Sequence, residues 1–201
     1  MSKINNDIYI YPTDTVWGIG CSIYSRSGYE KIADIKKSEK NKPLSIMFGS
    51  IDDVVKYFQL PEGMTSVWMK NFFKLETTLG LPLKFAKIPI PEWVSGGSDF
   101  ISLRCLETEA VKFIYHELHA PFFSTSLNIT GDAPITELSA ALNFQKKYAP
   151  GTHLVNSSLT TELSGSSSTI VFFKKKLEFE IIREGKRIIE VKEQLKKLSG
   201  R

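Results

Sequence analysis

Residues 11–20 read YPTDTVWGIG and place a polar turn between two apolar stretches. Thr13 and Thr15 offer hydroxyls on either side of Asp14, and two glycines follow within the same stretch. Residues 8–11 before the turn are typical of a short strand. Ligands of open α/β sheets bind just beyond strand ends, so these polar side chains could form a binding site. An ordinary polar turn explains the same residues, and the turn taken alone favours that interpretation.

The composition is that of a globular protein. Of the 201 residues, 42% are hydrophobic and 24% charged, which predicts a single domain over 1–201, with a core at about 7–186 and a closing helix at 188–198. The formal net charge of +4 suits an anionic ligand or RNA, although a solvated basic surface explains it equally well. With no signal peptide and no long apolar run, we expect a cytoplasmic protein with no membrane partner.

The cysteines and histidines do not indicate a metal centre. Cys21 and Cys105 lie far apart in the sequence, so neither a disulfide framework nor a zinc spacing follows from them. His116 and His119 are three residues apart, but no cluster of acidic or cysteine ligands accompanies them. We therefore expect no metal site formed by the protein.

Strand-like and helix-like segments alternate along the chain, and strands dominate toward its end. This order predicts an α/β protein with a mixed sheet and helices packed on it. The expected strands, by residue range, are 8–11, 44–48, 100–106, 122–126, 152–156, 168–174 and 178–184, with an extended segment at 79–87. The expected helices are 27–37 with a capping box at Ser27–Glu30, 50–58, 65–74, 107–118, 137–148 and 190–198, and 88–99 is expected to be a loop.

Four lysines gather at the end of the first expected helix and in the loop after it. They are Lys36, Lys37, Lys40 and Lys42. Several lysines on one loop can bind phosphate as point charges, but cations also stabilise the C-terminus of any helix. Lys36 has no obvious role in the core, so its replacement by alanine is expected to leave the fold intact.

Two segments rich in hydroxyl groups adjoin expected strands. They read STSLNITG at 124–131 and SGSSSTIVFF at 164–173. Hydroxyls, an amide and free backbone N–H groups suit phosphate or carboxylate, while a capped or flexible loop explains each segment equally well. The standard glycine-rich nucleotide fingerprints are absent, and no Ser/His/Asp or Cys/His motif indicates covalent catalysis.

Taken together, five segments resemble the YrdC family in their order and spacing. They are YPTDTVWGIG, IKKSEKNKPLSIMF, STSLNITG, STIV and IIREG, and the resemblance covers roughly residues 7–186. The family includes the threonylcarbamoyl-AMP synthases and the YciO-like proteins. The C-terminal domain of the longer synthases is not matched, so the chain resembles the short, single-domain form. The resemblance implies an open, twisted mixed α/β sheet with flanking helices and a concave basic groove.

The resemblance also implies an activity and its residues. The synthases make threonylcarbamoyl-AMP and pyrophosphate from ATP, bicarbonate and L-threonine, and Mg²⁺ is expected with the ATP. The product modifies tRNA, and members of the family are also described as binders of double-stranded RNA. Residue by residue, the family motifs imply charge from Lys36, Lys42 and Arg183, substrate contacts from Thr13, Thr15 and Arg104, and nucleotide contacts from Ser126, Asn128, Ser168 and Thr169.

Two departures from the family pattern leave a second hypothesis open. The arginine of the family's Lys-x-Arg motif is Ser38 here, and the family's WPGPLT segment reads FKLETT at 73–78. Serine cannot replace a bidentate phosphate donor, although Lys37 or Lys40 could compensate from nearby. The sequence therefore predicts either a synthase or a divergent YciO-like paralogue that binds nucleotide or double-stranded RNA without synthase activity.

Overall fold

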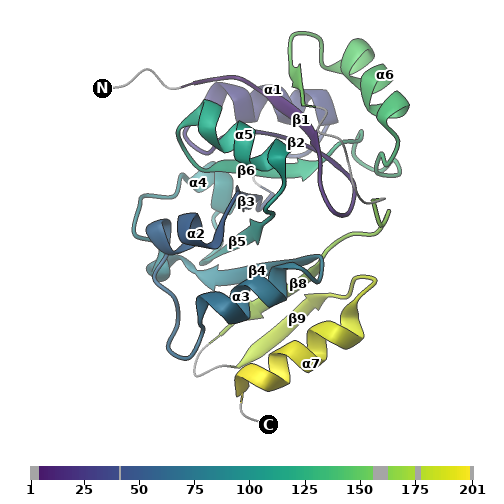
Figure 1. The fold of residues 1–201 in the computed structure, drawn as a ribbon. Coiled ribbons are helices and arrows are strands. Elements are labelled where there is room, and N and C mark those ends of the chain that lie inside the picture. The colour runs from purple at the N-terminus through teal and green to yellow at the C-terminus, as the bar shows by residue number, and fades with distance from the viewer. Residues whose placement is uncertain (1–4, 41, 156–162, 175–177, 200–201) are drawn as a thin grey trace.

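The computed structural model describes residues 5–40, 42–155, 163–174 and 178–199, and within them the strands join into one mixed sheet (Figure 1). The strands are β1 Tyr9–Pro12, β2 Trp17–Ser22, β3 Ser45–Phe48, β4 Thr77–Pro82, β5 Phe100–Cys105, β6 Phe122–Ser126, β7 His153–Leu154, β8 Thr169–Phe173 and β9 Phe179–Arg183. Their order is β7-β1-β2-β6-β3-β5-β4-β8-β9. The pairs β7–β1, β3–β5 and β4–β8 are parallel and the others are antiparallel.

The helices flank this sheet, as expected for the α/β class. They are α1 Arg26–Lys36, α2 Ile51–Tyr57, α3 Ser66–Phe73, α4 Glu92–Ser95, α5 Glu109–Leu118, α6 Leu138–Tyr148 and α7 Ile188–Ser199, with a 3-10 turn η1 at Leu83–Phe85. In the part of the chain that the structure describes, no helix is long and apolar enough to cross a membrane. The mixed α/β architecture is confirmed, while the basic character of its groove stays a prediction.

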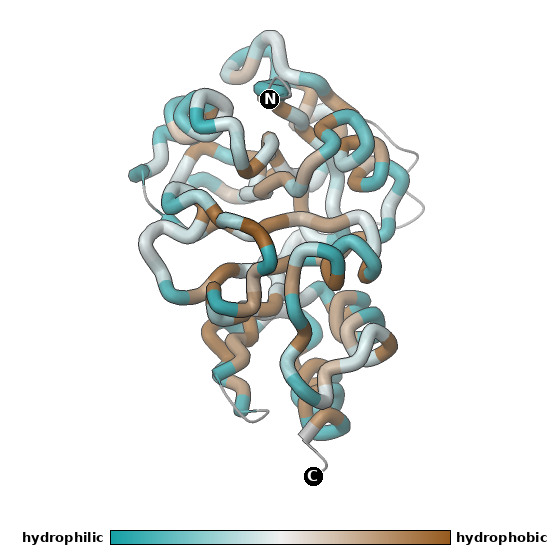
Figure 2. Tube along the Cα trace, turned by 90° about the vertical axis from the view of Figure 1, so that its left-hand side faces the viewer, coloured by the Kyte–Doolittle hydropathy of each residue, from teal (hydrophilic) through white to brown (hydrophobic). Residues whose placement is uncertain are grey.

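Alternation along the strands gives the two faces of the sheet different roles. Ile19, Leu103 and Val171 join the main hydrophobic core with α1, α3 and α7. Figure 2 shows hydrophobic and hydrophilic residues alternating along the chain. On the other face, Tyr11 and Met47 pack against α5 in a smaller core. Helix α5 contacts β1 and β3, which leaves room for a cavity beyond them on the same face.

The main difference from the sequence prediction is β2, which the turn-like reading of residues 11–20 missed. Its two glycines are explained by close contacts across the sheet. A Cβ on Gly20 would lie 2.0 Å from the carbonyl oxygen of Phe123, and one on Gly18 would lie 3.2 Å from the Ser124 hydroxyl. Only glycine at position 20 leaves room for the Phe123 carbonyl, while the side chains around Gly18 leave little room for a Cβ. Both glycines belong to the regular strand β2.

Smaller corrections concern caps and short helices. The N-cap of α1 is Ser25, whose hydroxyl accepts a hydrogen bond from the Gly28 N–H, so the predicted capping box at Ser27 is wrong. Helix α4 lies within the segment expected to be a loop, and η1 interrupts the segment expected to be extended. The cap at Ser50 and the other long helices agree with the prediction.

Candidate active site

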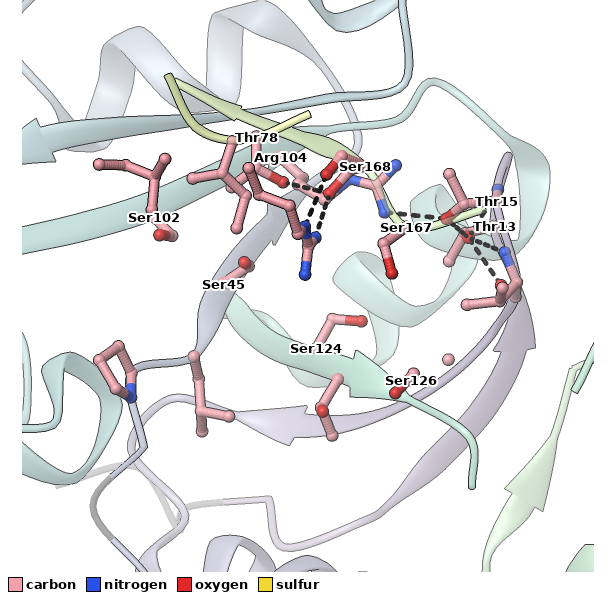
Figure 3. Close-up of a pocket in the computed structure, with 18 of the residues that line it drawn as sticks. Thr13, Thr15, Ser45, Thr78, Ser102, Arg104, Ser124, Ser126, Ser167 and Ser168 are labelled. Carbon is pink, nitrogen blue, oxygen red and sulfur yellow. Dashed lines mark hydrogen bonds between the residues drawn. The ribbon is translucent and has the colours of Figure 1, made fainter. Parts of the chain in front are cut away.

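A cavity of about 330 Å³ lies on the face of the sheet that packs against α5, since Arg104 of its lining is paired with Met47 of the smaller core. We call it the arginine pocket. Its polar lining includes Thr13, Thr15, Arg104, Ser168 and Arg183 (Figure 3). These residues come from the turn between β1 and β2, from β5, and from the start of β8 and the end of β9. The structure therefore brings together most of the residues that the motifs indicated in separate parts of the sequence.

The turn after β1 is held by its own hydroxyl groups. Thr13 Oγ1 donates to the Val16 carbonyl at 2.7 Å and accepts from the Thr15 N–H at 3.1 Å. The hydroxyls of Thr13 and Thr15 lie 3.0 Å apart, and both residues are buried. Thr13 thus fixes the turn, while Thr15 also accepts a hydrogen bond of 3.4 Å from Arg104 Nη1.

Arg104 reaches the pocket because of strand alternation. Ile101 and Leu103 of β5 point into the main core, so Ser102 and Arg104 point to the opposite face. The Arg104 guanidinium donates from Nη2 to Asp14, and their side chains are only 12% and 23% exposed. A largely buried ion pair fixes the direction of the guanidinium, which presents a preorganised cation to the cavity.

Arg183 contributes a second cation from β9. Its guanidinium donates to the carbonyl of Ser168 at 3.0 Å and to the Ser168 hydroxyl at 3.1 Å. That hydroxyl also lies 2.9 Å from the hydroxyl of Thr78. Burial lowers the pKa of Arg183 below its usual value, and the positive charge of Arg104 lowers it further. Because none of the described residues that line the pocket carries a carboxylate, the cavity suits an anion.

A second cavity of about 250 Å³ adjoins the first. We call it the lysine pocket, since Lys36 and Lys42 are among its lining residues. Pro43, Leu44 and Ser126 line both cavities, so the two share a wall. One ligand with separate anionic parts could therefore occupy both.

Lys36 is buried, contrary to the expectation that it has no role in the core. It is 6% exposed, and its ammonium donates to the carbonyl of Ser126, to the carbonyl of Asn128 at 2.9 Å and to Asn128 Oδ1 at 3.1 Å. Burial lowers its pKa to about 8. The carbonyl of Lys36 also accepts from the Thr130 N–H at 2.8 Å. Lys36 therefore ties the end of α1 to the loop after β6.

Lys42 and Ser38 occupy the outer part of the lysine pocket. The Lys42 side chain is 56% exposed and lies 3.5 Å from the Glu39 carboxylate. Ser38 lines the pocket, and its N–H donates to the Ala33 carbonyl as α1 ends. Lys42 is thus the exposed cation of this pocket, and Ser38 provides no charge beside it.

The loop after β6 is organised around Asn128. Ser126 Oγ donates to Asn128 Oδ1 at 2.6 Å, and Asn128 Nδ2 donates to the carbonyls of Ile129 and Asp132, each at 2.9 Å. Ser126 and Asn128 both line the lysine pocket. Thr169 is not among the described residues that line either cavity, and its hydroxyl accepts from the Gly185 N–H at 3.0 Å. The structure therefore places Thr169 at a backbone contact.

Sequence reasoning missed Ser45 and Ser102, which line the arginine pocket, whereas Ser124 lies in the hydroxyl-rich segment that the sequence indicated. The hydroxyl of Tyr11 donates to Ser124. Desolvation by burial raises the pKa of Tyr11. The alternation of polar and apolar residues in β5 could have indicated Ser102 together with Arg104. Ser45 could not be found in this way, because only the pairing of β3 with β6 places it opposite Ser124.

The acidic side chains beside the two cavities lie next to cations. Asp14 pairs with Arg104, and the Glu39 carboxylate lies 3.5 Å from the Lys42 ammonium. Among the described residues, no group of three or more His, Cys, Asp or Glu side chains could hold a metal ion.

The sequence matches a protein family model over residues 4–185, the Sua5/YciO/YrdC model described as "Telomere recombination". The chain is 30% identical over 142 residues to the threonylcarbamoyl-AMP synthase of Aliivibrio fischeri, which covers 68% of this chain and 75% of that protein. It is 24% identical over 136 residues to the threonylcarbamoyl-AMP synthase of Hydrogenovibrio crunogenus, covering 66% of this chain and 72% of that protein.

Solved structures share the fold at low sequence identity. The P. abyssi Sua5 structure complexed with L-threonine superposes with a TM-score of 0.74 and 20% identity, covering 90% of this chain and 51% of that one. The E. coli YciO structure gives a TM-score of 0.70 and 16% identity, covering 92% of this chain and 86% of that one. The present chain thus spans about half the length of that Sua5 protein.

Proposed function

The chain belongs to the Sua5/YciO/YrdC family, and on that premise we propose that it is a threonylcarbamoyl-AMP synthase that uses ATP, bicarbonate and L-threonine and serves tRNA modification. The observation that carries the proposal is the pair of adjoining cavities. The arginine pocket offers two oriented guanidinium groups and buried threonine hydroxyls, and the lysine pocket offers Lys42 and the polar loop around Asn128.

The proposed chemistry needs no protein nucleophile. The amine of threonine and bicarbonate form a carbamate with loss of water. A carbamate oxygen then attacks the α-phosphorus of ATP, and the bond to the leaving pyrophosphate breaks. Such a reaction is accelerated by positioning the reactants and by stabilising the charge that develops on phosphate oxygens. Both cavities are lined by groups that can do this.

We assign the residues to these tasks as follows. Arg104 would pair with the carboxylate of threonine, because a guanidinium matches a carboxylate with two parallel hydrogen bonds. Thr13 and Thr15 would shape that end of the arginine pocket. Arg183, with Ser168, would stabilise charge on the phosphates.

The adenylate would extend into the lysine pocket. Ser126 and Asn128 would contact it there, and Lys42 would supply an exposed cation. Lys36 would position the loop around Asn128, which contacts the adenylate, and its own positive charge would lie next to that loop. Thr169 would support Gly185 and the start of β8, since its hydroxyl is already bonded there. Any Mg²⁺ would enter with ATP as its counter-ion, since the described residues provide no site of their own.

Relatives named synthase favour this activity over the YciO-like alternative without synthase activity. The link to RNA and the cytoplasmic location follow from the proposed role in tRNA modification and stay predictions. If RNA binds directly, the net charge of +4 suggests a mainly electrostatic contact. Affinity for a short duplex in a filter-binding titration should then fall steeply with salt, whereas no binding at low salt would argue against direct contact.

The test is an assay of the purified protein with ATP, bicarbonate and L-threonine. We expect pyrophosphate release that requires all three substrates, and threonylcarbamoyl-AMP detected by mass spectrometry. Reactions that lack threonine or bicarbonate are the controls. Binding of ATP and threonine without formation of the adenylate would reject the synthase and favour the paralogue.

A further inference from the structure

Glu76, between α3 and β4, has an unusual backbone conformation. Its φ is 54°, and positive φ angles are rare among the described non-glycine residues. The other two such residues are Lys37 and His119, which are the left-handed C-caps of α1 and α5. Glu76 has no such capping role, because α3 ends at Lys74 in a right-handed conformation. A left-handed glutamate is disfavoured, so the surrounding contacts must maintain it.

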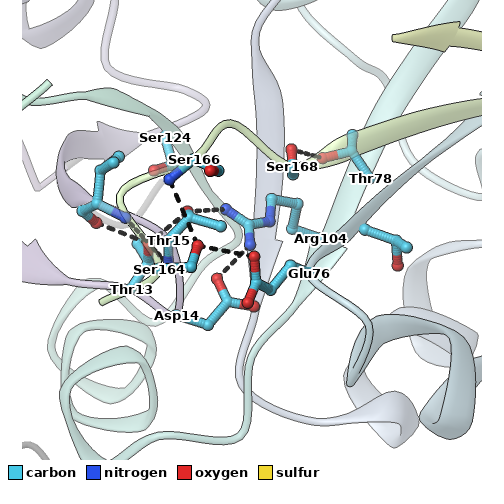
Figure 4. A network of polar contacts seen from close by, with 12 residues as sticks. Thr13, Asp14, Thr15, Glu76, Thr78, Arg104, Ser124, Ser164, Ser166 and Ser168 are labelled. Atoms are coloured by element: carbon cyan, nitrogen blue, oxygen red, sulfur yellow. Dashed lines mark hydrogen bonds and ion pairs between the residues drawn. The ribbon is translucent and has the colours of Figure 1, made fainter. Parts of the chain in front are cut away.

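Those contacts lead to one segment, residues 164–168, which precedes β8. The Glu76 carboxylate accepts a hydrogen bond of 2.7 Å from Ser164 Oγ (Figure 4). The Glu76 carbonyl accepts one of 3.0 Å from the Thr169 N–H. Glu76 therefore holds this segment near both of its ends. Its side chain secures the beginning and its main chain secures the start of the strand.

The other side of the segment is bonded to the turn that carries the two pocket threonines. The Ser164 N–H donates to the Asp14 carbonyl at 3.2 Å, and the Gly165 N–H donates to the Thr15 carbonyl at 2.9 Å. Gly165 has a φ of 72°, which glycine adopts without strain. The segment is thus fixed between Glu76 and the turn.

The segment then forms part of the wall of the arginine pocket. Ser167 and Ser168 line the cavity, and Ser168 is the residue that receives both hydrogen bonds from Arg183. A shift of the segment would move these groups and loosen the contact with the turn of Thr15. The position of Glu76 is therefore transmitted to two sides of the cavity.

We propose that Glu76 is a positioning residue of the arginine pocket, which clamps residues 164–168 against the Thr13–Thr15 turn and thereby sets the affinity for the substrate bound there. Glu76 lies in the segment 73–78, where the sequence departs from the pattern of the family it resembles. The identity of the substrate rests on the proposed function, but the clamp itself does not. The clamp depends on the hydrogen bond between Glu76 and Ser164.

The decisive variant is Glu76→Gly. It removes the carboxylate but tolerates the positive φ, so thermal stability should be unchanged or slightly higher. The KM for threonine should nevertheless rise about tenfold, the loss expected for one hydrogen bond to a charged group, with a smaller change in kcat. Glu76→Gln retains an acceptor for Ser164 and should restore most of the affinity. A residue that merely supported the fold would lose stability and activity together.

Ser164→Ala tests the residue that donates to Glu76. It should also raise the KM for threonine. The double variant Glu76→Gly/Ser164→Ala should have a KM no higher than either single variant, because both substitutions remove the same hydrogen bond. Glu62→Gln, at an exposed turn, is the matched control and should change nothing. An unchanged KM in Glu76→Gly, or additive effects in the double variant, would overturn the clamp.

Hydrogen exchange measured without substrate separates the clamp from the activity. Backbone amides of residues 163–169 should exchange faster in Glu76→Gly and Ser164→Ala than in the parent and in Glu62→Gln. Faster exchange in a protein that forms no adenylate would uphold the clamp and reject the proposed function. Unchanged exchange would reject the clamp whatever the activity.

Discussion

The arginine pocket and the lysine pocket share a wall but hold their cations in different ways. In the arginine pocket, Arg104 is fixed by Asp14 and Arg183 by Ser168, and both guanidinium groups still face the cavity. In the lysine pocket, the buried Lys36 uses its ammonium to hold the loop around Asn128, while Lys42 stands in solvent. The arginine pocket is therefore preorganised for anions. In the lysine pocket, the exposed positive charge lies at the end of the flexible Lys42 side chain.

This difference predicts how much each cation matters. Ordered, desolvated charges stabilise a reacting anion far more than exposed ones, which are screened by water and salt. We therefore expect the largest losses of activity in the arginine pocket and the smallest at the exposed lysine. Lys36 should fall between them, with a loss of fold stability that the exposed Lys42 does not share.

The largest effect is expected for Arg104→Met, which should lower kcat/KM about 100-fold or more. The variant removes a bidentate donor and leaves the Asp14 carboxylate unpaired near the substrate. Unfolding free energy should also fall by about 1–3 kcal/mol. Steady-state kinetics and chemical denaturation measure the two effects.

A second substitution separates the two losses of Arg104→Met. Adding Asp14→Asn should restore stability but not activity, because it removes the unpaired charge without replacing the donor. The exposed Arg26, changed to Met, is the control. Full activity in Arg104→Met would show that the arginine pocket is not the site of the reaction.

Lys36→Met comes second and should affect both fold and activity. It removes the ammonium donor from the carbonyls of Ser126 and Asn128, while Asn128 Oδ1 keeps its bond from Ser126 Oγ, and this should lower the unfolding free energy by about 1–3 kcal/mol. The KM for ATP should rise about tenfold as the loop shifts. Denaturation curves and ATP titrations test this. A variant with weakened ATP binding and unchanged stability would restore the simpler view of Lys36 as a phosphate ligand.

The same lysine predicts a pH dependence. Its pKa is about 8 in the folded protein and 10.5 as the reference value, so the unfolded chain binds more protons between these pH values. The contribution of Lys36 to unfolding free energy should therefore be lowest below pH 8 and rise up to about pH 10.5. Denaturation curves of the parent and of Lys36→Met across this pH range give the contribution of Lys36 as the difference in unfolding free energy. A constant difference between the two proteins would contradict the lowered pKa.

Ser38→Arg should produce a smaller change, of opposite sign. Ser38 lines the lysine pocket beside Lys42, where a planar guanidinium could bind a phosphate. We expect kcat/KM to rise about threefold, which corresponds to a transition state stabilised by less than about 1 kcal/mol. Ser38→Lys, which adds charge without the fork, should give less. A loss of rate in Ser38→Arg would show that this pocket is built around serine.

Lys42→Ala should have the smallest effect. Its ammonium is exposed and its ion pair with Glu39 is 3.5 Å long, so stability should hardly change. The KM for ATP should rise by about threefold at most at low ionic strength and return to the parent value at high salt. Lys31→Ala, on the exposed side of α1, is the control. A loss as large as that of Arg104→Met would reverse the ranking of the two pockets.

How far the sequence predicted the site depends on the kind of interaction. Motifs indicated Thr15, Arg104 and Arg183, and the structure brings them to one cavity. Motifs also indicated Lys36, but its burial and its three acceptors depend on the loop after β6, which is about 90 residues away in the chain. No local pattern reports such a contact.

The sequence by itself determined the α/β class, most helices and strands, and the family. Periodicity and caps are local signals, and they act within a few residues. The tertiary structure alone decided that Gly18 and Gly20 form a strand, because the Phe123 carbonyl on β6 approaches Gly20 and the Ser124 hydroxyl approaches Gly18. It also decided that Glu76 meets Ser164, since a hydrogen bond forms only where the fold brings two distant segments within 3 Å or so of each other.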